Sequence, residues 1–237
     1  MTDTRIELYA RCVGVFFILS MVCGWFGEVY VPSQMLAGDG ATTADQLRAN
    51  DALFRVGFAA YLVEAFSDVV IAWLFYVILK PVNRDLALLS AFFGLLATAL
   101  FAFTKMLYYS APLFLSDSPQ LAAFAPDQLD ALAGAFISFY ARLSGITFLF
   151  YGTAWVIRGY LTYRSDFLPR WLGIVMMAAG LGFMAKTVTE LLAPDWSSML
   201  LIAPMIVNAI AVAGWMLVKG VDRAAWARAA EQERAGL

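Results

Sequence analysis

The residues of this chain that could carry chemistry are ionisable side chains embedded in long apolar segments. An ionisable group at bilayer depth costs at least about 2.5 kcal/mol to insert, so it persists where it is paired, faces water or has a function. By distance from the segment ends, we place one group near the middle of the bilayer and another in its outer third. The first group is Glu64, Asp68 and Arg142, and the second is Glu28, Arg55, Lys105, Lys186 and Glu190. A polar cavity that opens to the outside would explain this bias.

Helical spacing predicts which of the central side chains meet. Glu64 and Asp68 are four residues apart, so they share one helical face with Tyr61, which precedes Glu64 by about one turn. Two carboxylates this close repel each other unless a cation lies between them. Arg142 is the cation at matching depth. We therefore predict a Glu64/Asp68–Arg142 cluster that joins two apolar segments.

More than one interpretation of these charges stays open. Arg142 with the two carboxylates could be a structural ion pair that fixes helix register, although one arginine leaves a surplus negative charge. Lys186 and Glu190 are four residues apart and form either part of a binding site or an ordinary salt bridge near a helix end. Lys105, Lys186 and Arg55 could instead extend their charged groups to the outer interface.

The residue types that are missing limit the chemistry. The chain has no histidine, which excludes histidine-ligated haem, zinc sites that use histidine, and catalysis by a serine–histidine–aspartate triad. Its two cysteines, Cys12 and Cys23, lie about 16 Å apart on one helix and cannot bridge each other. Without a nucleophile motif, a catalytic base would have to be Glu64 or Asp68. We therefore expect no catalytic residue, metal site or cofactor, and we favour a protein that is not an enzyme.

The apolar segments define the fold class. Hydrophobic residues make up 62% of the 237 residues and charged residues 14%, against roughly half and about a quarter in soluble domains. The apolar blocks have the length, about 20 residues, that a helix needs to cross a bilayer core of about 30 Å. We predict an all-α, polytopic membrane helical bundle with six transmembrane helices, over residues 8–31, 53–79, 86–109, 126–163, 168–192 and 196–218.

Basic residues between the apolar segments predict the orientation, because Lys and Arg concentrate in cytoplasmic loops. With the N-terminus in the cytoplasm, Arg48 is the only basic residue of the outside loops. The cytoplasmic segments hold Arg5, Arg11, Lys80, Arg84, Arg158, Arg164, Arg170, Lys219, Arg223, Arg228 and Arg234. We therefore predict two cytoplasmic termini, a six-helix transmembrane domain over 1–220 and a charged amphipathic cytoplasmic tail over 221–237, in which Trp226 could be an interfacial anchor. The net charge of −2 does not indicate a nucleic-acid partner.

Three stretches near the ends of the apolar segments resemble one family. They are Phe75-Tyr76-Val77-Ile78-Leu79-Lys80-Pro81-Val82-Asn83-Arg84, Phe124-Ala125-Pro126-Asp127-Gln128-Leu129, and the segment from Gly159 to Gly173 that contains Arg164-Ser165-Asp166-Phe167-Leu168-Pro169-Arg170. The chain resembles a bacterial integral membrane family known as domain of unknown function 4386, over nearly its whole length. The resemblance implies a multi-pass protein of the bacterial cytoplasmic (inner) membrane. The family has no assigned biochemical activity, so it implies no functional residue.

Two functions remain open on this basis. The favoured one is binding or transport of a small solute or lipid in an outward-open polar cavity lined by Glu28, Tyr61, Glu64, Asp68, Lys105, Arg142, Lys186 and Glu190. The alternative is an accessory or sensor subunit of a membrane complex, in which the buried charges are a purely structural ion-pair network. The expected partners are the lipid bilayer, a small-molecule or lipid ligand, and either a membrane protein or a second copy of the chain.

Overall fold

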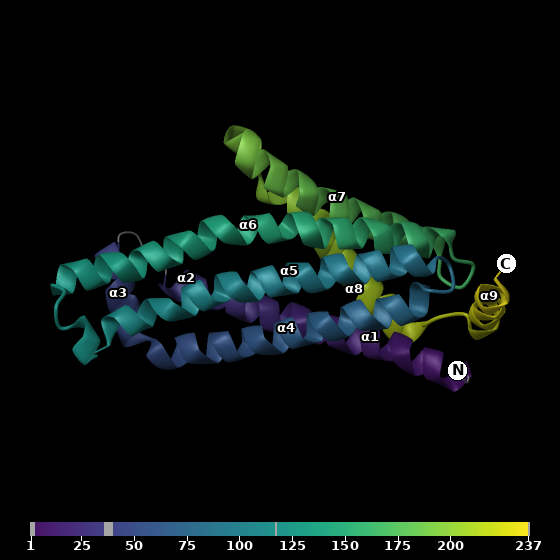
Figure 1. Ribbon diagram of the computed structural model, residues 1–237, viewed down its shortest axis with the longest axis horizontal. Helices are drawn as coiled ribbons and strands as arrows, with labels where there is room; N and C mark the ends of the chain where they lie inside the picture. Colours follow the sequence, from purple (N-terminus) through teal and green to yellow (C-terminus); the bar gives the residue numbers. More distant parts are fainter. Residues whose placement is uncertain (1–2, 36–39, 117, 237) are drawn as a thin grey trace. The chain divides into compact units, whose positions relative to one another are not determined.

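The computed structural model describes residues 3–35, 40–116 and 118–236, and Figure 1 shows their helices in chain order. All of the secondary structure in these residues is helical, which confirms the predicted all-α class. The long helices are α1 (Asp3–Gly24), α4 (Asp51–Leu79), α5 (Arg84–Ser110), α6 (Pro126–Arg164), α7 (Arg170–Leu192), α8 (Ala203–Val218) and α9 (Arg223–Ala235). The shorter ones are the π-helical segment η1 (Trp25–Tyr30), α2 (Val31–Met35), α3 (Gly40–Ala49) and the 3-10 helices η2 (Ala111–Leu115), η3 (Pro119–Leu121), η4 (Pro194–Trp196) and η5 (Met199–Ile202).

Within the described residues, six helical segments are long and apolar enough to cross a membrane. They are Arg5–Gln34, Asp51–Leu79, Arg84–Leu115, Pro126–Arg164, Arg170–Leu192 and Met199–Val218. Each overlaps one of the six predicted segments, so six long apolar helices at these positions in the sequence are confirmed. The longest is α6, whose 39 residues rise about 58 Å, well beyond the thickness of a bilayer core.

The chain divides into two compact units, which we describe separately. Unit 1 comprises Met1–Ser20, Phe66–Thr98 and Gly145–Leu237, and unit 2 comprises Met21–Ala65 and Ala99–Ser144. The helices α1, α4, α5 and α6 therefore contribute one part to each unit, whereas α7, α8 and α9 belong to unit 1. Sequence reasoning did not predict this division, because it runs through the middle of helices and depends on side-chain contacts.

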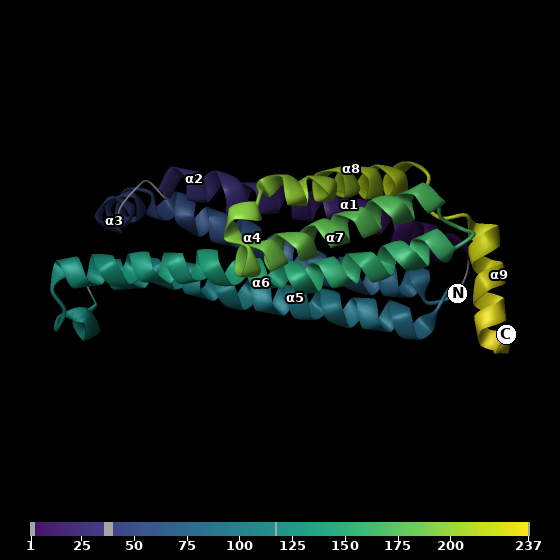
Figure 2. The same ribbon diagram turned by 90° about the horizontal axis from the view of Figure 1, so that it is seen from above.

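Close packing of α6 and α7 organises unit 1. A Cβ atom added to Gly152 would lie 2.5 Å from the carbonyl oxygen of Gly180, and one added to Gly159 would lie 2.7 Å from that of Gly173. Small residues of this kind let two membrane helices approach until their backbones touch. The following helix, α8, packs beside α7 (Figure 2). Together these contacts place residues 145–163 of α6 against a helical hairpin.

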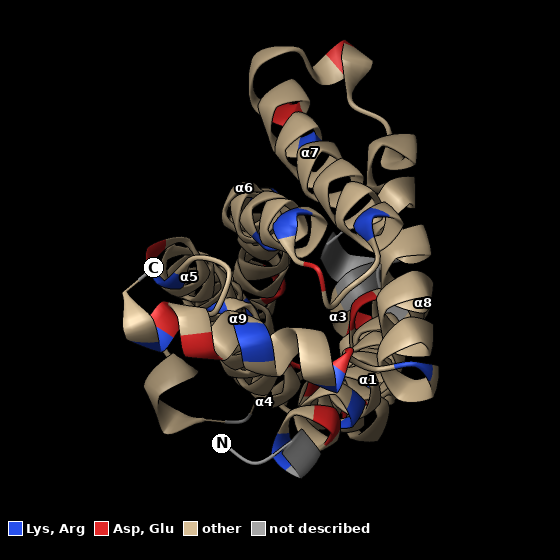
Figure 3. Cartoon of the chain, turned by 90° about the vertical axis from the view of Figure 1, so that its right-hand side faces the viewer, with Lys and Arg blue, Asp and Glu red and all other residues tan. Residues whose placement is uncertain are grey.

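The C-terminal helix α9 also packs onto unit 1. Asp222 caps its N-terminus by accepting a backbone N–H bond at 3.0 Å, and Arg223 forms an ion pair with Glu7 of α1. Trp226 is buried, and its Nε1 donates to the Ile78 carbonyl oxygen at 2.9 Å. The prediction that Trp226 is an interfacial anchor is therefore wrong, because its indole N–H has a protein acceptor. Figure 3 shows basic and acidic residues along α9.

Replacing Gly180 by alanine should destabilise unit 1. The added Cβ atom would lie 2.5 Å from the Gly152 carbonyl oxygen and 2.8 Å from the Val156 backbone nitrogen. Overpacking of this kind costs about 1–3 kcal/mol, so the midpoint of thermal unfolding in detergent should fall. Gly214 of α8 provides the matched control, because a Cβ atom there meets nothing within 4 Å. Equal midpoints for Gly180→Ala and Gly214→Ala would contradict the close packing of α6 and α7.

Candidate functional site

Unit 2 has an aromatic core that encloses a lysine. The buried residues of this core are Val31, Leu47, Phe54, Tyr108, Ala111, Ala133, Ile137 and Tyr140. Lys105 on α5 is 1% exposed, and its Nζ atom lies 4.1–5.4 Å from the ring centroids of Tyr61, Phe101, Tyr108 and Tyr140. An ammonium group over aromatic faces is attracted by the quadrupole of each ring. The aromatic residues therefore replace part of the water that the lysine has lost.

Lys105, Glu28 and Tyr140 form a closed polar ring. Lys105 forms an ion pair with the Glu28 carboxylate, and its Nζ donates to Tyr140 Oη at 2.6 Å. Tyr140 Oη in turn donates to Glu28 Oε2 at 2.6 Å. The ring joins α5, α6 and η1, because each supplies one member. The alternative that Lys105 extends to the outer interface is wrong, since a carboxylate and a phenol inside unit 2 compensate its charge.

Glu28 lies in the π-helical segment η1. Such segments are rare and occur frequently at functional sites. Gly27 in the same segment permits a close approach to α4, since a Cβ atom there would lie 3.0 Å from the Gly57 carbonyl oxygen. Sequence reasoning predicted an uninterrupted α-helix here, because π and α segments have the same apolar composition. Gly24 and Gly27 are the residues in the sequence that could have indicated a local departure from α-helical geometry.

Two other predicted ligands, Tyr61 and Glu64, lie in the same cluster. The Tyr61 ring is one of those around Lys105. The Glu64 carboxylate lies beside Gly24, where an added Cβ atom would be 2.5 Å from Oε1, and it interacts electrostatically with Lys105. Unit 2 therefore brings together Glu28, Tyr61, Glu64 and Lys105 from the predicted site.

Asp68 belongs to a polar cluster in unit 1. Its carboxylate accepts hydrogen bonds from Ser20 Oγ at 2.9 Å and from Tyr151 Oη at 2.5 Å. The Tyr151 hydroxyl also lies 2.9 Å from Thr98 Oγ1. Asp68 and Glu64 are four residues apart on α4, yet each has partners in its own unit.

The predicted Glu64/Asp68–Arg142 cluster is wrong. Arg142 is exposed and forms no ion pair with any residue that the structure describes. Tyr140, two residues earlier on α6, is buried and contacts Lys105. Two residues correspond to about 200° around a helix, so turning Tyr140 inward turns Arg142 outward.

Lys186 and Glu190 form the predicted pair on α7 in unit 1. Lys186 Nζ lies 2.5 Å from Glu190 Oε1 and donates to Ser197 Oγ at 2.8 Å. Lys186 is buried, whereas the side chain of Glu190 is 41% exposed. Lys186 therefore does not extend to the outer interface. The geometry fits the interpretation of this pair as a salt bridge near a helix end.

Arg158 is a buried cation that sequence reasoning missed. We counted it among the cytoplasmic basic residues, but it lies inside unit 1 on α6 and is 4% exposed. Its Nε donates to Ser90 Oγ at 3.1 Å. Its burial was not predicted, because a charged residue near a helix end looks the same in the sequence whether it faces solvent or the helix interface. One feature of the sequence could have indicated the burial of Arg158. It lies within the 39-residue helix α6, six residues before the last, and not in the loop that follows.

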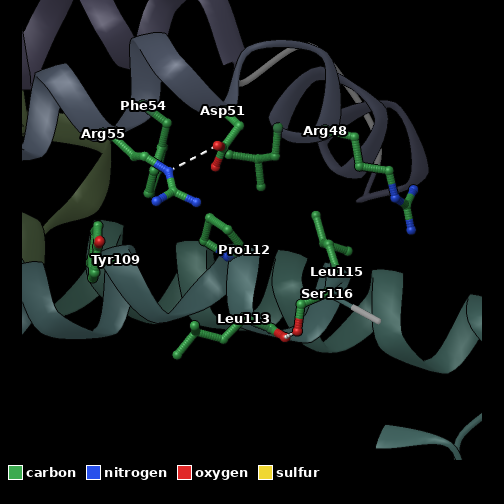
Figure 4. A pocket seen from close by; sticks show the side chains of 10 residues that line it. Arg48, Asp51, Phe54, Arg55, Tyr109, Pro112, Leu113, Leu115 and Ser116 are labelled. Atoms are coloured by element: carbon green, nitrogen blue, oxygen red, sulfur yellow. Dashed lines mark hydrogen bonds and ion pairs between the residues drawn. The ribbon is translucent and has the colours of Figure 1, made fainter. Parts of the chain in front are cut away.

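A cavity of about 320 Å³ opens in unit 2 beside the start of α4 and the end of α5 (Figure 4). Its lining combines basic, acidic, aromatic and aliphatic side chains. The lining residues are Leu47, Arg48, Asp51, Phe54, Arg55, Tyr109, Pro112, Leu113, Leu115 and Ser116.

Arg55 is the cation directed into this cavity. Its Nε donates to Asp51 Oδ2 at 2.8 Å, and its side chain is 68% exposed. Figure 4 shows Arg55 extending from α4 toward Tyr109 and Pro112, whereas the guanidinium group of Arg48 points away from them. The exposed position of Arg55 fits the interpretation that its charge extends to the interface.

Arg48 is held by two acidic residues of unit 2. It donates to Asp130 Oδ1 at 2.6 Å and to Asp45 Oδ1 at 3.2 Å. The hydrogen bond with Asp130 raises the pKa of Arg48 above its ordinary value. Arg48 therefore stays charged and serves mainly to connect α3 with α6.

Phe54 connects the cavity with the enclosed lysine. Its side chain lines the cavity, and its ring centroid lies 4.9 Å from that of Tyr108, which is 5.0 Å from that of Tyr140. Tyr108 Oη is buried and has no hydrogen-bond partner among the described residues. A buried polar group without a partner costs about 1–3 kcal/mol, so this hydroxyl is a candidate contact for a bound molecule.

The six long apolar helices define a multi-pass membrane protein. Residues 12–220 match the family described as Domain of unknown function (DUF4386), and the chain belongs to this family. The resemblance carried by the helix-end stretches is therefore confirmed.

One relative among the curated proteins is an uncharacterized protein of Archaeoglobus fulgidus, which is 26% identical over 117 residues. The matched region covers 49% of this chain and 56% of the relative, so the chain spans little more than half of the relative's length. No solved structure matches the chain.

Replacing Lys105 by methionine should destabilise unit 2. The change keeps most of the side-chain volume but leaves Glu28 and Tyr140 without their cation. Removing one partner of a buried ion pair costs about 3–5 kcal/mol, so the midpoint of thermal unfolding in detergent should fall well below that of the unmodified protein.

Arg142→Met is the matched control, because it removes an exposed cation. The double variant Glu28→Gln/Lys105→Met should recover much of the lost stability, since no uncompensated charge remains. If Lys105→Met and Arg142→Met unfold at the same temperature, the polar ring is not a stabilising element.

Proposed function

We propose that this membrane protein binds a small solute or lipid with an acidic group in the cavity of unit 2. The observation that carries the proposal is a cavity of about 320 Å³ whose wall residue Phe54 also packs against the aromatic core around Lys105. Small-molecule sites have volumes of about 300–1,000 Å³ and combine apolar walls with few polar groups. The cavity has both properties and suits a ligand of modest size.

The lining indicates the chemistry of the ligand. Arg55 provides a cation with terminal nitrogens that donate to none of the described residues, and a guanidinium group suits a phosphate or carboxylate. Phe54, Leu113 and Leu115 provide apolar surface next to it. An acidic group attached to an apolar body therefore complements the cavity better than a fully polar solute does.

The depth of Arg55 supports a lipid headgroup as the ligand. Arg55 precedes Leu79, the last residue of α4, by 24 positions, which corresponds to about 36 Å. The hydrocarbon core is about 30 Å thick and the bilayer with headgroups about 40–45 Å. With Leu79 at one edge of the core, Arg55 falls in the headgroup layer of the other side.

The proposal includes an orientation. We assign both termini to the cytoplasm of a bacterial cell and the cavity to the outer side of its cytoplasmic membrane. The support is the concentration of Lys and Arg on the terminal side of the apolar segments.

Native mass spectrometry of the purified protein in detergent tests the proposal. Phosphatidylglycerol should be retained better than phosphatidylcholine, and Arg55→Gln should lose about tenfold in retention of the anionic lipid. Arg142→Gln is the matched control, because it removes an exposed arginine outside the cavity. Glycerol 3-phosphate as competitor distinguishes a soluble phosphate ester from a lipid. If Arg55→Gln retains the lipid as well as Arg142→Gln does, the cavity is not the binding site.

An accessory subunit is the second candidate function. Arg142 is exposed on α6 together with Phe139, Leu143 and Ile146, each at least 39% exposed. A charged residue within an apolar helical face suits a membrane protein partner. A stoichiometric partner that co-purifies with the unmodified protein and is lost from Arg142→Leu would support this function.

A further inference from the structure

Arg158 is a buried cation in unit 1 without a direct acidic partner. The other buried cations among the described residues, Lys105 and Lys186, each form an ion pair, but Arg158 forms none. Asp68 interacts with Arg158 electrostatically. Its two oxygens, however, already accept hydrogen bonds from hydroxyl groups at 2.9 and 2.5 Å. The charge of Arg158 is therefore compensated only from a distance.

The surroundings of Arg158 hold its guanidinium group in place. Its Nε donates to Ser90 Oγ at 3.1 Å, and Ser90 Oγ donates to the Ala154 carbonyl oxygen at 3.1 Å. The Cζ atom lies 5.3 Å from the ring centroid of Phe75 and 5.1 Å from that of Trp155. A serine and two aromatic rings thus orient the group before any ligand arrives, which lowers the entropy cost of binding.

Most donors of this guanidinium group are available. Arginine has five N–H donors, and in the described part of the chain only the one on Nε has an acceptor. Neither terminal nitrogen is among the fully enclosed atoms that lack a hydrogen bond, and 4% of Arg158 stays exposed. A small part of the side chain therefore remains exposed. Gly94 keeps space beside Nη2, since an added Cβ atom would lie 2.5 Å from it.

We infer that Arg158 binds an oxyanion, a phosphate or carboxylate group, inside unit 1. The terminal nitrogens of a planar guanidinium group match two oxygens of such a group in a bidentate arrangement. The ligand is either a free anion or the phosphate of a lipid headgroup, since both present the same chemistry. Arg158 lies about 9 Å along α6 from Arg164, the last residue of the helix, so it is close to that end of the helix. This site shares no residue with the cavity of unit 2 and does not depend on the function proposed for it.

Thermal unfolding of the purified protein in a phosphate-free nonionic detergent tests the inference. Sodium phosphate and sodium acetate are each titrated against sodium chloride at constant ionic strength. If the ligand is a free anion, one or both should raise the unfolding midpoint in a saturable way above the chloride value. Arg158→Lys keeps the positive charge but removes the planar guanidinium group that binds two oxygens at once. The half-saturating concentration of the anion should therefore rise at least about tenfold. Arg164→Lys, an exposed arginine on the same helix, should leave it unchanged.

A second arm distinguishes the source of the anion. Short-chain phosphatidylglycerol is titrated against short-chain phosphatidylcholine under the same conditions. A saturable rise with phosphatidylglycerol alone assigns the site to a lipid headgroup, and a rise with phosphate or acetate assigns it to a free anion.

Two results would overturn the inference. One is the absence of a saturable rise with any of the three oxyanions, and the other is a half-saturating concentration that Arg158→Lys does not change. Should Arg158→Lys fail to fold, Ser90→Ala replaces it, because it removes the acceptor that orients the guanidinium group and keeps the charge. It should weaken the binding several-fold, and unchanged binding would equally refute the inference.

Discussion

The burial of the Lys105 ammonium group is the interaction on which unit 2 depends. A charge that leaves water is tolerated only where protein groups compensate it, and the penalty for an uncompensated charge is several kcal/mol. Glu28, Tyr140 and the surrounding aromatic rings provide this compensation. They come from η1, α4, α5 and α6, so these four segments must be placed and rotated together. The π-helical turn at Glu28 and the contact between Gly27 and Gly57 are parts of that same arrangement.

Two interior charges of unit 1, Asp68 and Arg158, are compensated differently. Asp68 accepts hydrogen bonds from neutral hydroxyl groups, and Arg158 lies over aromatic faces beside a serine. Neither charge is neutralised by direct contact, in contrast to Lys105. Close contacts between the glycines of α6 and α7 pack these two helices tightly in the same unit. In unit 1, Asp68 and Arg158 are therefore held by neutral hydroxyl groups, whereas the ring of unit 2 pairs a cation directly with a carboxylate.

Part of the candidate site could be predicted from residue type and depth. Charges inside apolar segments need partners, and Glu28, Glu64 and Lys105 lie close together in unit 2, although depth had placed Glu64 in a different group from the other two. The predicted pairing of Arg142 with Glu64 and Asp68 was wrong, because the depth of a residue in the bilayer does not determine how its helix is rotated about its axis. On α6, Tyr140 and Arg142 are two positions apart, about 200° around the helix, so the burial of Tyr140 leaves Arg142 exposed. The cavity beside Phe54 has no sequence signature, and the position of Arg158 within α6 is only a weak one, since both features arise from contacts between separate segments.

The sequence by itself determined the helical class, the six apolar segments and the family, because each depends on composition and on motifs within one stretch of chain. A bilayer requires about 20 consecutive apolar residues for each crossing, and that requirement is local. Only the tertiary structure decided which charges meet. The hydrogen bond from Tyr140 to Glu28 joins residues 112 positions apart. The ring that it closes with Lys105 forms only when η1, α5 and α6 are each rotated so that these side chains face one another. Spacing along a single helix cannot fix that rotation, because many rotations bury similar amounts of apolar surface.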